Sequence, residues 1–418
     1  MVIRAFVSIF LDSIAINKSA WPLWVLAASI SWPRPDLRGP RTPFQTKGKS
    51  VSSTAPRISG QTAGPSLRAT VEGLPDYVAG RRATDAKVAA LASNESHEVP
   101  LPSVERVVRE SISRINRYPD MAASALRERL ALFLKVSPEE VAVGPGSVGV
   151  LQQIMAATCG PGDEVVFAWR SFEAYPILVT LTGATPVPVP LDQDENHDLD
   201  GMLAAINDRT RVVIICTPNN PTGTTVGQSQ LERFVAAVPS HVLVVIDEAY
   251  VEYVGPHGID SLGIFRTHAN VCVLRTFSKA YGLAGLRVGY AAAHKTLAQG
   301  LRRVALPFGV STLAQTAAIA SLNATREIQE RAAAVIEERS RVIQHLRSVG
   351  WHLPDSQANF IWLRADEELK KQLLDAFDRA DILVRGYVED GVRVTLADAT
   401  TNDRVLEVLG DRATFDKR

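Results

Sequence analysis

The 418-residue sequence has few cysteines, no excess of charge of either sign and no long apolar run, features that would each indicate a particular class of protein. It holds only three cysteines, Cys159, Cys216 and Cys272, which lie far apart and follow no CxxC spacing. They are typical of small buried side chains in a reducing compartment, so we expect neither disulfides nor a metal site. Lys plus Arg and Asp plus Glu both number 45, and this balance gives no support for a nucleic-acid partner. Any anion must therefore be bound by a few locally placed groups.

Long uninterrupted apolar runs are also missing. The stretch Val2–Ile30 is broken by residues such as Asp12 and Lys18, so it lacks the roughly 20 apolar residues of a membrane span and makes a poor signal peptide. A Pro-, Arg- and Ser-rich stretch follows, from Trp32 to Arg68. We interpret residues 1–68 as a disordered or non-native leader, with a membrane-surface anchor as the alternative. Without a convincing export signal, we expect a cytoplasmic protein without a membrane partner.

From Leu74 onward, short β-branched runs alternate with amphipathic stretches. Such runs, bounded by Gly, Pro or Asn, are typical of buried strands in a mostly parallel sheet. The expected strands are Val141–Val143, Glu164–Phe167, Pro186–Val189, Arg211–Thr217, His241–Ile246, Val271–Thr276 and Leu286–Ala293. Helical spacing is found between them, in Val148–Cys159 and Leu231–Val238. The pattern predicts a large, doubly wound α/β domain over residues 101–320.

A second, smaller α+β domain is predicted over residues 321–418. An Ala-, Glu- and Arg-rich helical region runs to about Val349, and the expected strands Asn359–Leu363 and Val392–Leu396 follow. Residues 69–100 are expected to form an N-terminal arm that folds back and completes this domain.

Lys279 and Asp247 follow two of the expected strands. Lys279 comes after Val271–Thr276, where its side chain can point into a cleft at the strand ends. Desolvation there would lower its pKa and make it a nucleophile toward carbonyls, although a lone lysine is more often a surface residue. Asp247 ends the apolar run Val244–Ile246 and, if buried, needs a cationic partner such as a protonated pyridine nitrogen. A helix cap is the structural alternative for Asp247.

Two further segments carry polar groups suited to a ligand. The run Thr217–Gly223 holds two prolines and a glycine, so a rigid turn can aim Asn220, although it can also be only a turn. Arg287 stands at the start of the next apolar run, and a guanidinium fits a phosphate with two hydrogen bonds.

The segment Gly144–Gly149 formally matches the dinucleotide motif GxGxxG. The match is weak, because the first acid after it, Asp163, is too near and does not end a second strand. The backbone N–H groups of Gly146, Ser147 and Val148 still predict an anion site at a helix N-terminus. A monophosphate suits such a site as well as a pyrophosphate does.

The runs Asn219–Gly223, Asp247–Tyr250 and Ser278–Arg287 resemble those of fold-type I aminotransferases, which depend on pyridoxal 5'-phosphate (PLP). The resemblance narrows to the histidinol-phosphate and aromatic amino acid aminotransferase group through Leu91–Glu95, Asn116–Asp120, Ser356–Phe360 and Gly391–Thr395. It covers about residues 72–410. It implies the PLP-dependent transferase fold of type I, PLP as cofactor, and a homodimer with shared active sites.

The resemblance also implies roles for individual residues. Lys279 would carry the cofactor as a Schiff base and move the substrate proton, and Asp247 would pair with the pyridinium nitrogen. Asn220 and Tyr250 would hydrogen-bond the phenolic oxygen. The ring face would be covered by Phe172, and the phosphate would be held by Gly146, Ser147, Val148, Thr276, Ser278, Arg287 and, from the other subunit, Tyr118. Phe172 could instead be ordinary core, and Tyr118 a packed loop residue.

Substrate contacts are implied for Arg393, Arg385, Asn94 and Asn359. Arg393 would clamp the α-carboxylate, and a structural ion pair is its alternative. Arg385 occupies a position at which histidinol-phosphate enzymes place an arginine toward the substrate phosphate.

The departures from the histidinol-phosphate pattern favour another substrate. Val148 and Gly149 stand where many of those enzymes carry an acidic pair, and the run Trp169–Phe172 resembles bacterial aromatic amino acid aminotransferases. We therefore predict transfer of the amino group of aromatic amino acids to 2-oxoglutarate, giving aromatic oxo acids and L-glutamate, with histidinol-phosphate aminotransferase as the alternative. A nicotinamide oxidoreductase and a non-catalytic PLP-binding regulator remain from other classes. The regulator would need a DNA-binding module, for which the leader offers no pattern.

Overall fold

The computed structural model describes residues 65–74, 80–81, 85, 87–255 and 258–415. The chain divides into two units, Met1–Gly64 and Pro65–Arg418, and all described residues belong to the second. The predicted leader therefore lies outside the described residues, except for its last four positions. None of the helices in the described part is both long and apolar enough to cross a membrane.

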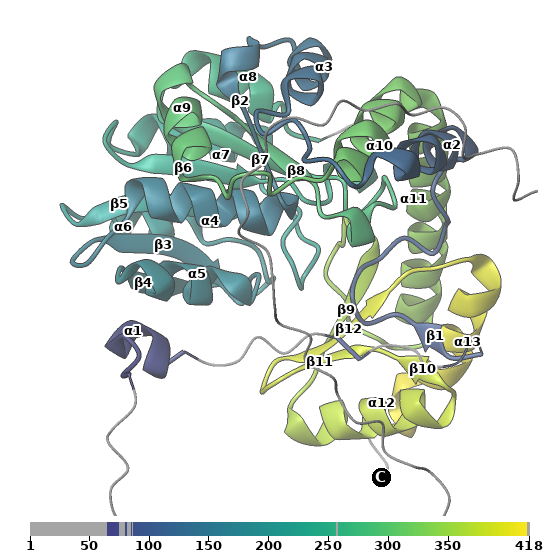
Figure 1. The fold of residues 1–418 in the computed structure, drawn as a ribbon. Helices are drawn as coiled ribbons and strands as arrows, with labels where there is room; N and C mark the ends of the chain where they lie inside the picture. Colours follow the sequence, from purple (N-terminus) through teal and green to yellow (C-terminus); the bar gives the residue numbers. More distant parts are fainter. Residues whose placement is uncertain (1–64, 75–79, 82–84, 86, 256–257, 416–418) are drawn as a thin grey trace, which may run out of the picture. The chain divides into compact units, whose positions relative to one another are not determined.

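A seven-stranded sheet forms the centre of the larger part of the described chain (Figure 1). Its strands are β2 (Val141–Gly144), β3 (Glu164–Trp169), β4 (Thr185–Pro190), β5 (Thr210–Cys216), β6 (Leu243–Asp247), β7 (Val271–Thr276) and β8 (Gly289–Ala293). The order is β2-β8-β7-β6-β5-β3-β4, and only β8 runs antiparallel to its neighbours. The predicted mostly parallel sheet and the α/β fold class are confirmed.

One predicted strand is too long. The strand expected over Leu286–Ala293 begins only at Gly289, because Ala284–Leu286 form a turn of 3-10 helix and Arg287 adopts a left-handed backbone with φ of 55°. The left-handed residue turns the chain before β8 begins, and it places the Arg287 side chain beside the cleft instead of within the strand.

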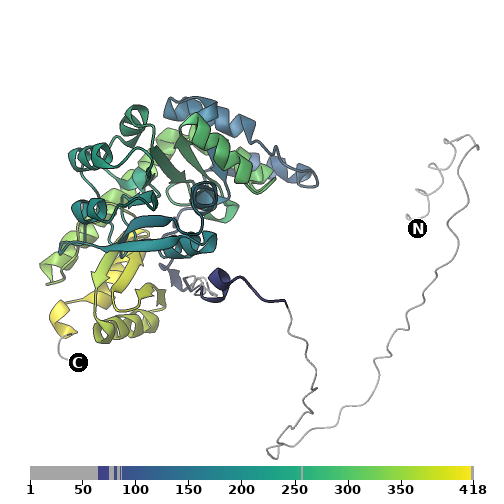
Figure 2. The same cartoon turned by 90° about the vertical axis from the view of Figure 1, so that its left-hand side faces the viewer.

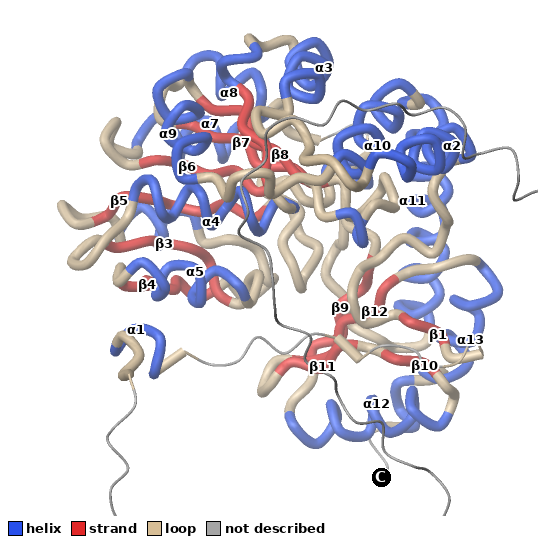
Figure 3. Tube along the Cα trace, in the orientation of Figure 1, coloured by secondary structure: helices blue, strands red, loops and turns tan. Residues whose placement is uncertain are grey.

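Helices cover both faces of this sheet, as Figure 3 shows. One face carries α4 (Gly146–Thr158), α5 (Ala174–Thr182) and α9 (Lys295–Val304), and the other carries α3 (Ser124–Leu134), α6 (Leu199–Ala204), α7 (Gln228–Ala237), α8 (Ser261–Thr267) and α10 (Thr312–Asn323). Within β5, Val212 and Ile214 face the first layer, whereas Val213 and Ile215 face the second. Burial on both faces explains why these strands are continuous apolar runs.

The C-terminal elements, coloured yellow in Figures 1 and 2, gather around a smaller sheet. This antiparallel sheet has the order β11-β12-β9, from β9 (Phe360–Arg364), β11 (Arg385–Tyr387) and β12 (Gly391–Thr395). A short parallel pair joins β1 (Ala89–Ala90) to β10 (Ile382–Leu383). The helices α11 (Thr325–Ser348), α12 (Glu367–Arg379) and α13 (Ala399–Leu409) share their apolar core with these strands.

The remaining helices are short or lie between the parts of the chain that form the two main sheets. They are α1 (Ala69–Glu72), α2 (Pro102–Ser111) and the 3-10 turns Ile112–Arg114, Pro138–Glu140, Val251–Tyr253, Ala284–Leu286 and Arg412–Thr414. The division into domains at residues 101 and 321 stays a proposal. It is supported by the separate apolar core of the C-terminal elements and by β1, through which the arm pairs with β10.

Candidate active site

A cavity of about 560 Å³ opens where β5, β6 and β7 end. Parallel strands bring their carboxyl ends to one edge of a sheet, and here Cys216 of β5 lies in register with Asp247 of β6. The opposite wall comes from β11 and β12. Among the predicted site residues, those lining the cavity are Asn94, Ser147, Val148, Phe172, Asn220, Asp247, Tyr250, Thr276, Ser278, Lys279, Arg287, Arg385 and Arg393. Gly146, Asn359 and Tyr118 do not line it.

Lys279 lies inside this cavity. Its Nζ donates a hydrogen bond to the backbone oxygen of Ser93 at 3.0 Å and lies 5.6 Å from the centre of the Tyr250 ring. Burial, and after it the positive charge of Arg393, lowers the pKa of Lys279 to about 7. A substantial fraction of this amine is therefore neutral near pH 7, and a neutral amine can act as nucleophile or base.

Asp247 is 5% exposed, at the end of β6. Its Oδ2 accepts a 2.7 Å hydrogen bond from the hydroxyl of Tyr175, whereas its Oδ1 is buried without a hydrogen-bond partner. Burial raises the pKa of Asp247 to about 6, and the Tyr175 hydrogen bond opposes that rise. An unpartnered buried carboxylate oxygen at the cavity floor is suited to a cationic N–H donor.

Anion-binding groups gather at the N-terminus of α4. This helix begins at Gly146, and Ser147 and Val148 of its first turn line the cavity, where N-terminal backbone N–H groups favour an anion. Arg287 Nη1 donates to Ser278 Oγ at 3.1 Å, and Thr276 Oγ1 lies 3.0 Å from the same oxygen. Gly146 has φ of 79°, and a Cβ there would collide with the Arg287 guanidinium, so glycine is needed for this close approach.

Arg393 of β12 is 6% exposed and forms no ion pair with any described residue. Its Nη1 donates to Asn220 Oδ1 and, at 2.8 Å, to the Tyr387 hydroxyl, and its Nη2 donates to the backbone oxygen of Ala92 at 2.7 Å. Its Nε has no acceptor. A buried guanidinium held by neutral groups calls for an anionic ligand.

Tyr250, which is 3% exposed, is held from behind by Asn94. Asn94 Nδ2 donates to the Tyr250 hydroxyl at 2.9 Å, and Asn94 Oδ1 accepts from Thr395 at 3.1 Å. Asn359 Nδ2 donates to the backbone oxygen of Asn94 at 3.3 Å. Asn359 therefore lies one layer behind the cavity wall, where it supports Asn94.

Arg385, on β11, forms an ion pair that the sequence did not suggest. Its Nη2 lies 2.8 Å from Oε2 of Glu173, the residue before α5. Both side chains line the cavity and are mostly buried, at 13% and 29% exposed. Arg385 is also directly opposite Arg393 in the β11–β12 register.

Tyr118 lies outside the cavity of its own chain. It is 82% exposed and stacks on Phe308, with ring centres 4.6 Å apart. Its neighbours Ile115 and Met121 are also exposed, at 64% and 65%, as is Leu306, at 70%. We call these five residues the apolar face.

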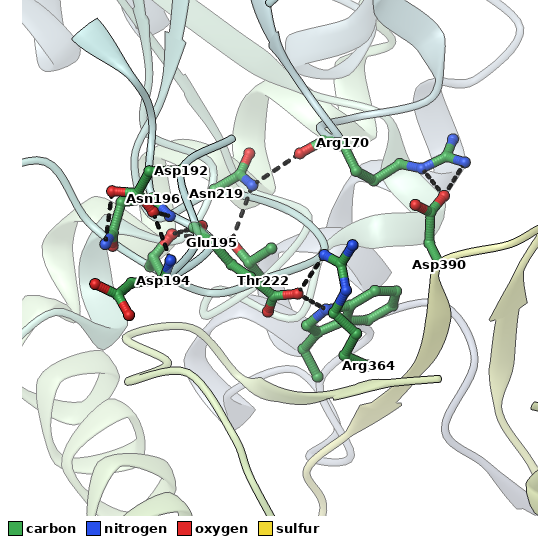
Figure 4. Close-up of polar contacts among 11 residues, drawn as sticks. Arg170, Asp192, Asp194, Glu195, Asn196, Asn219, Thr222, Arg364 and Asp390 are labelled. Atoms are coloured by element: carbon green, nitrogen blue, oxygen red, sulfur yellow. Dashed lines mark hydrogen bonds and ion pairs between the residues drawn. The ribbon is translucent and has the colours of Figure 1, made fainter. Parts of the chain in front are cut away.

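The loop that carries Asn220 is fixed by buried hydrogen bonds. Asn219 donates to Thr222 at 2.9 Å (Figure 4). Asn219 also accepts from Ser171 at 2.7 Å, and the hydroxyl of Thr222 lies 2.9 Å from that of Thr224. Gly223 has φ of 79°, and a Cβ there would collide with Ser356. The loop conformation therefore depends on side chains from distant segments as well as on its prolines.

Two ion pairs connect this region to the smaller sheet, and Figure 4 shows both. Arg170, after β3, pairs with Asp390, which precedes β12. Glu195, after β4, pairs with Arg364 of β9 at 2.8 Å and accepts from the Trp362 indole at 3.2 Å. These contacts hold the wall that carries Arg385 and Arg393 against the large sheet.

Sequence reasoning missed Tyr175, Glu173 and Tyr387. Tyr175 is in α5, whereas Phe172 precedes that helix, so no helical spacing linked the two residues, although their rings meet edge to face with centres 5.6 Å apart. Glu173 and Tyr387 contact the arginines only through tertiary structure. Among the described residues, no group of three or more His, Cys, Asp or Glu side chains could hold a metal ion.

Comparisons with known proteins agree with this geometry. The family model described as "Aminotransferase class I and II" matches residues 86–409. The aromatic amino acid aminotransferase of Streptomyces avermitilis is 52% identical over 347 residues, covering 82% of this chain and 96% of the relative. The protein of the same name from Mycolicibacterium smegmatis is 52% identical over 342 residues, covering 82% and 94%.

Solved structures with the same fold include histidinol-phosphate aminotransferase from Sinorhizobium meliloti in complex with pyridoxal-5'-phosphate. It has a TM-score of 0.76 and 26% identity, and the match covers 86% of this chain and all of that one. A mutant of Thermus thermophilus aspartate aminotransferase has a TM-score of 0.71 at 23% identity, and the match covers 84% of this chain and all of that one. At this identity the likeness supports the fold and nothing further.

Proposed function

This chain belongs to the class I and II aminotransferase family, and from that membership we propose that it transfers the amino group of aromatic amino acids to 2-oxoglutarate with pyridoxal phosphate as cofactor. The observation that carries the cofactor is the unpartnered Oδ1 of Asp247, in the same cavity as Lys279, Arg287 and the first turn of α4. The aromatic donor is supported by relatives at about half identity that bear this name.

The residues present fit this cofactor. Asp247 would pair with its ring nitrogen, and Phe172 would cover its ring. Ser147, Val148, Thr276, Ser278 and Arg287 would hold its phosphate, with Gly146 giving the guanidinium room. When bound, pyridoxal phosphate supplies an aldehyde that takes up amines and a ring that accepts an electron pair from the substrate Cα.

The chain's own residues would do the rest. Lys279 would bind the aldehyde covalently and, once released by the substrate amine, would move the proton from Cα as a base with a pKa near neutrality. Arg393 would orient the substrate through its α-carboxylate. Asn220 and Tyr250 would hydrogen-bond the phenolic oxygen, and Asn94 and Asn359 would hold Tyr250 and the wall behind it.

An absorbance and labelling experiment tests the cofactor and the lysine. The purified protein with added pyridoxal phosphate should show an absorbance band near the boundary of the ultraviolet and visible ranges. Reduction with labelled borohydride should remove this band and leave the label on Lys279. The variant Lys279→Ala should take no label. A colourless, unlabelled wild-type protein would refute the proposal and would leave the nicotinamide reading open.

Histidinol phosphate remains the second candidate donor, because Arg385 lies in the cavity directly opposite Arg393. Comparing kcat/KM for phenylalanine and histidinol phosphate decides between them. A strong preference for the phosphate ester would change the substrate and leave the chemistry unaltered.

We also propose that the protein is a homodimer with shared sites and that it is cytoplasmic. The dimer is supported by the apolar face, which exposes Tyr118 and its neighbours to solvent in the single chain. Mixing Lys279→Ala and Tyr118→Ala subunits tests it, because one site of each mixed dimer would then hold both wild-type residues. Activity should return on mixing, whereas sites built from one chain would stay inactive.

A further inference from the structure

Glu173 and Arg385 line the cavity together with Arg393, the proposed partner of the substrate anion. Arg385 of β11 and Arg393 of β12 are directly opposite each other in an antiparallel pair, so their side chains leave the same face of the smaller sheet. Both guanidinium groups also lie near the Tyr387 ring, at 5.6 and 5.7 Å from its centre. Two neighbouring arginines form a natural site for a dianion such as a phosphate monoester.

Glu173 changes this charge balance. Its Oε2 is 2.8 Å from Arg385 Nη2, and both side chains are largely removed from solvent, so their attraction is weakly screened. The N-terminal end of α5, directly after Glu173, further favours its negative charge. Among the described residues, no ion pair joins Arg393 to Glu95 or Asp247, the other acidic residues of the cavity lining. Together Arg385, Arg393 and Glu173 carry one net positive charge.

We infer that Glu173 is a specificity-determining residue that, by neutralising Arg385, sets the anion subsite for a carboxylate and against a phosphate ester. This inference rests on the proposed function, since it takes Arg393 as the partner of the substrate anion. An amino acid presents a single negative charge there, and one free guanidinium matches it. Histidinol phosphate presents a phosphate ester in place of the carboxylate, and that dianion would have to compete with Glu173 for Arg385.

Binding of two unreactive ligands to the cofactor-loaded protein tests the inference without turnover. The ligands 3-phenylpropanoate and 3-phenylpropyl phosphate share the aromatic ring and differ in the anion, and calorimetry gives the Kd of each. In Glu173→Gln the phosphate ester should bind about tenfold tighter or more, because Glu173 no longer competes with the phosphate for a charge-assisted contact with Arg385. The Kd of the carboxylate should change less than about threefold.

Two further variants control this result. Glu98→Gln removes a Glu–Arg pair of similar exposure outside the cavity, with Arg331, and should bind both ligands as the wild type does. The double variant E173Q/R385Q restores the wild-type net charge and should lose the gain in phosphate affinity. Glu173→Gln with unchanged phosphate affinity, or with equal gains for both ligands, would overturn the inference.

If Glu173→Gln does not fold, Arg385→Gln decides the same question. Glu173 would then be unopposed beside Arg393, and the affinity for 3-phenylpropanoate should fall about tenfold. An unchanged affinity would contradict the inference. Phenylalanine turnover by the wild type is measured separately: its absence would refute the aromatic aminotransferase proposal, whereas the ligand selectivity would still report on Glu173.

Discussion

Two titratable side chains, Lys279 and Asp247, have pKa values that burial moves toward neutrality from opposite directions. The pKa of Lys279 falls to about 7 and that of Asp247 rises to about 6. In both cases desolvation disfavours the charged form, which is a cation for the lysine and an anion for the aspartate. Neutral-pH chemistry at this site therefore depends on single buried groups, and each can be tested alone.

The reaction of Lys279 with pyridoxal phosphate should follow its pKa. Below pH 7 the amine is protonated and cannot attack, so the association rate for the cofactor-free protein should rise through pH 7 and level off above it. Arg393→Gln should move the midpoint upward, because the positive charge of Arg393 helps to lower the Lys279 pKa. Stopped-flow absorbance measures this rate. Arg326→Gln, at an exposed pair elsewhere, serves as the control, and a wild-type midpoint near pH 10 would contradict the expectation.

Tyr175 should matter for cofactor affinity although it lies beneath Asp247. Tyr175→Phe removes the 2.7 Å hydrogen bond that the tyrosine hydroxyl donates to Asp247 Oδ2. Losing a hydrogen bond to a charged group costs about 1.5–3 kcal/mol, so affinity for pyridoxal phosphate should fall about 10- to 100-fold at pH 7. Fluorescence titration of the cofactor-free protein measures it. Tyr253→Phe, another buried tyrosine outside the cavity lining, should leave the affinity unchanged.

Among the elements, β8 and the start of α4 approach each other closely beside the site. A Cβ on Gly289 would collide with backbone atoms of Gly146 and Ser147, which cannot move without shifting the N-terminus of the helix. The anion-binding amides therefore depend on a glycine in the neighbouring strand.

Gly289→Ala should both destabilise the protein and weaken its hold on phosphate. Overpacking of this kind costs about 1–3 kcal/mol of the free energy of unfolding. Urea unfolding measures that loss, and the affinity for pyridoxal phosphate should fall in parallel. Gly300→Ala in α9 has open space around its Cβ and should stabilise slightly, because alanine favours a helix. Equal stabilities for the two variants would contradict this account of the contact.

The sequence allowed the long buried strands to be predicted well. Strands β3, β5, β6 and β7 are mostly apolar runs covered on both faces, and each prediction lay within two residues of the observed bounds. Strands β1, β10 and β11 have only two or three residues, too few to show any periodicity. They form through pairing with distant segments, which local propensity does not report.

At the site, the residues next to strand ends were predictable and their partners were not. Asp247 ends β6, and Asn220 and Lys279 follow β5 and β7, so their place at one edge of the sheet followed from topology. The pairing of Arg385 with Glu173 joins residues 212 positions apart. No local pattern indicates such a contact. The sequence therefore did not show that a carboxylate neutralises the positive charge of Arg385.

For the molecule as a whole, Glu195 connects its two sheets. This side chain is 9% exposed and accepts from the buried indole of Trp362 and from Arg364. Glu195→Ala would leave the indole N–H without its partner, at a cost of about 1–3 kcal/mol in the free energy of unfolding. Glu330→Ala removes an exposed pair within α11 and should cost about 0.5 kcal/mol or less. Urea unfolding of both variants measures the difference, and equal losses would contradict a role for Glu195 in joining the sheets.

The unpartnered atoms Asp247 Oδ1 and Arg393 Nε also have a consequence for the life of the protein in a cell. Each is a desolvated polar group whose cost is removed only when a ligand arrives, so the empty chain should be less stable than the loaded one by an amount that grows with ligand concentration. Less stable chains unfold more often and are degraded sooner. We therefore expect the cellular amount of this enzyme to follow the supply of pyridoxal phosphate, the proposed partner of Asp247.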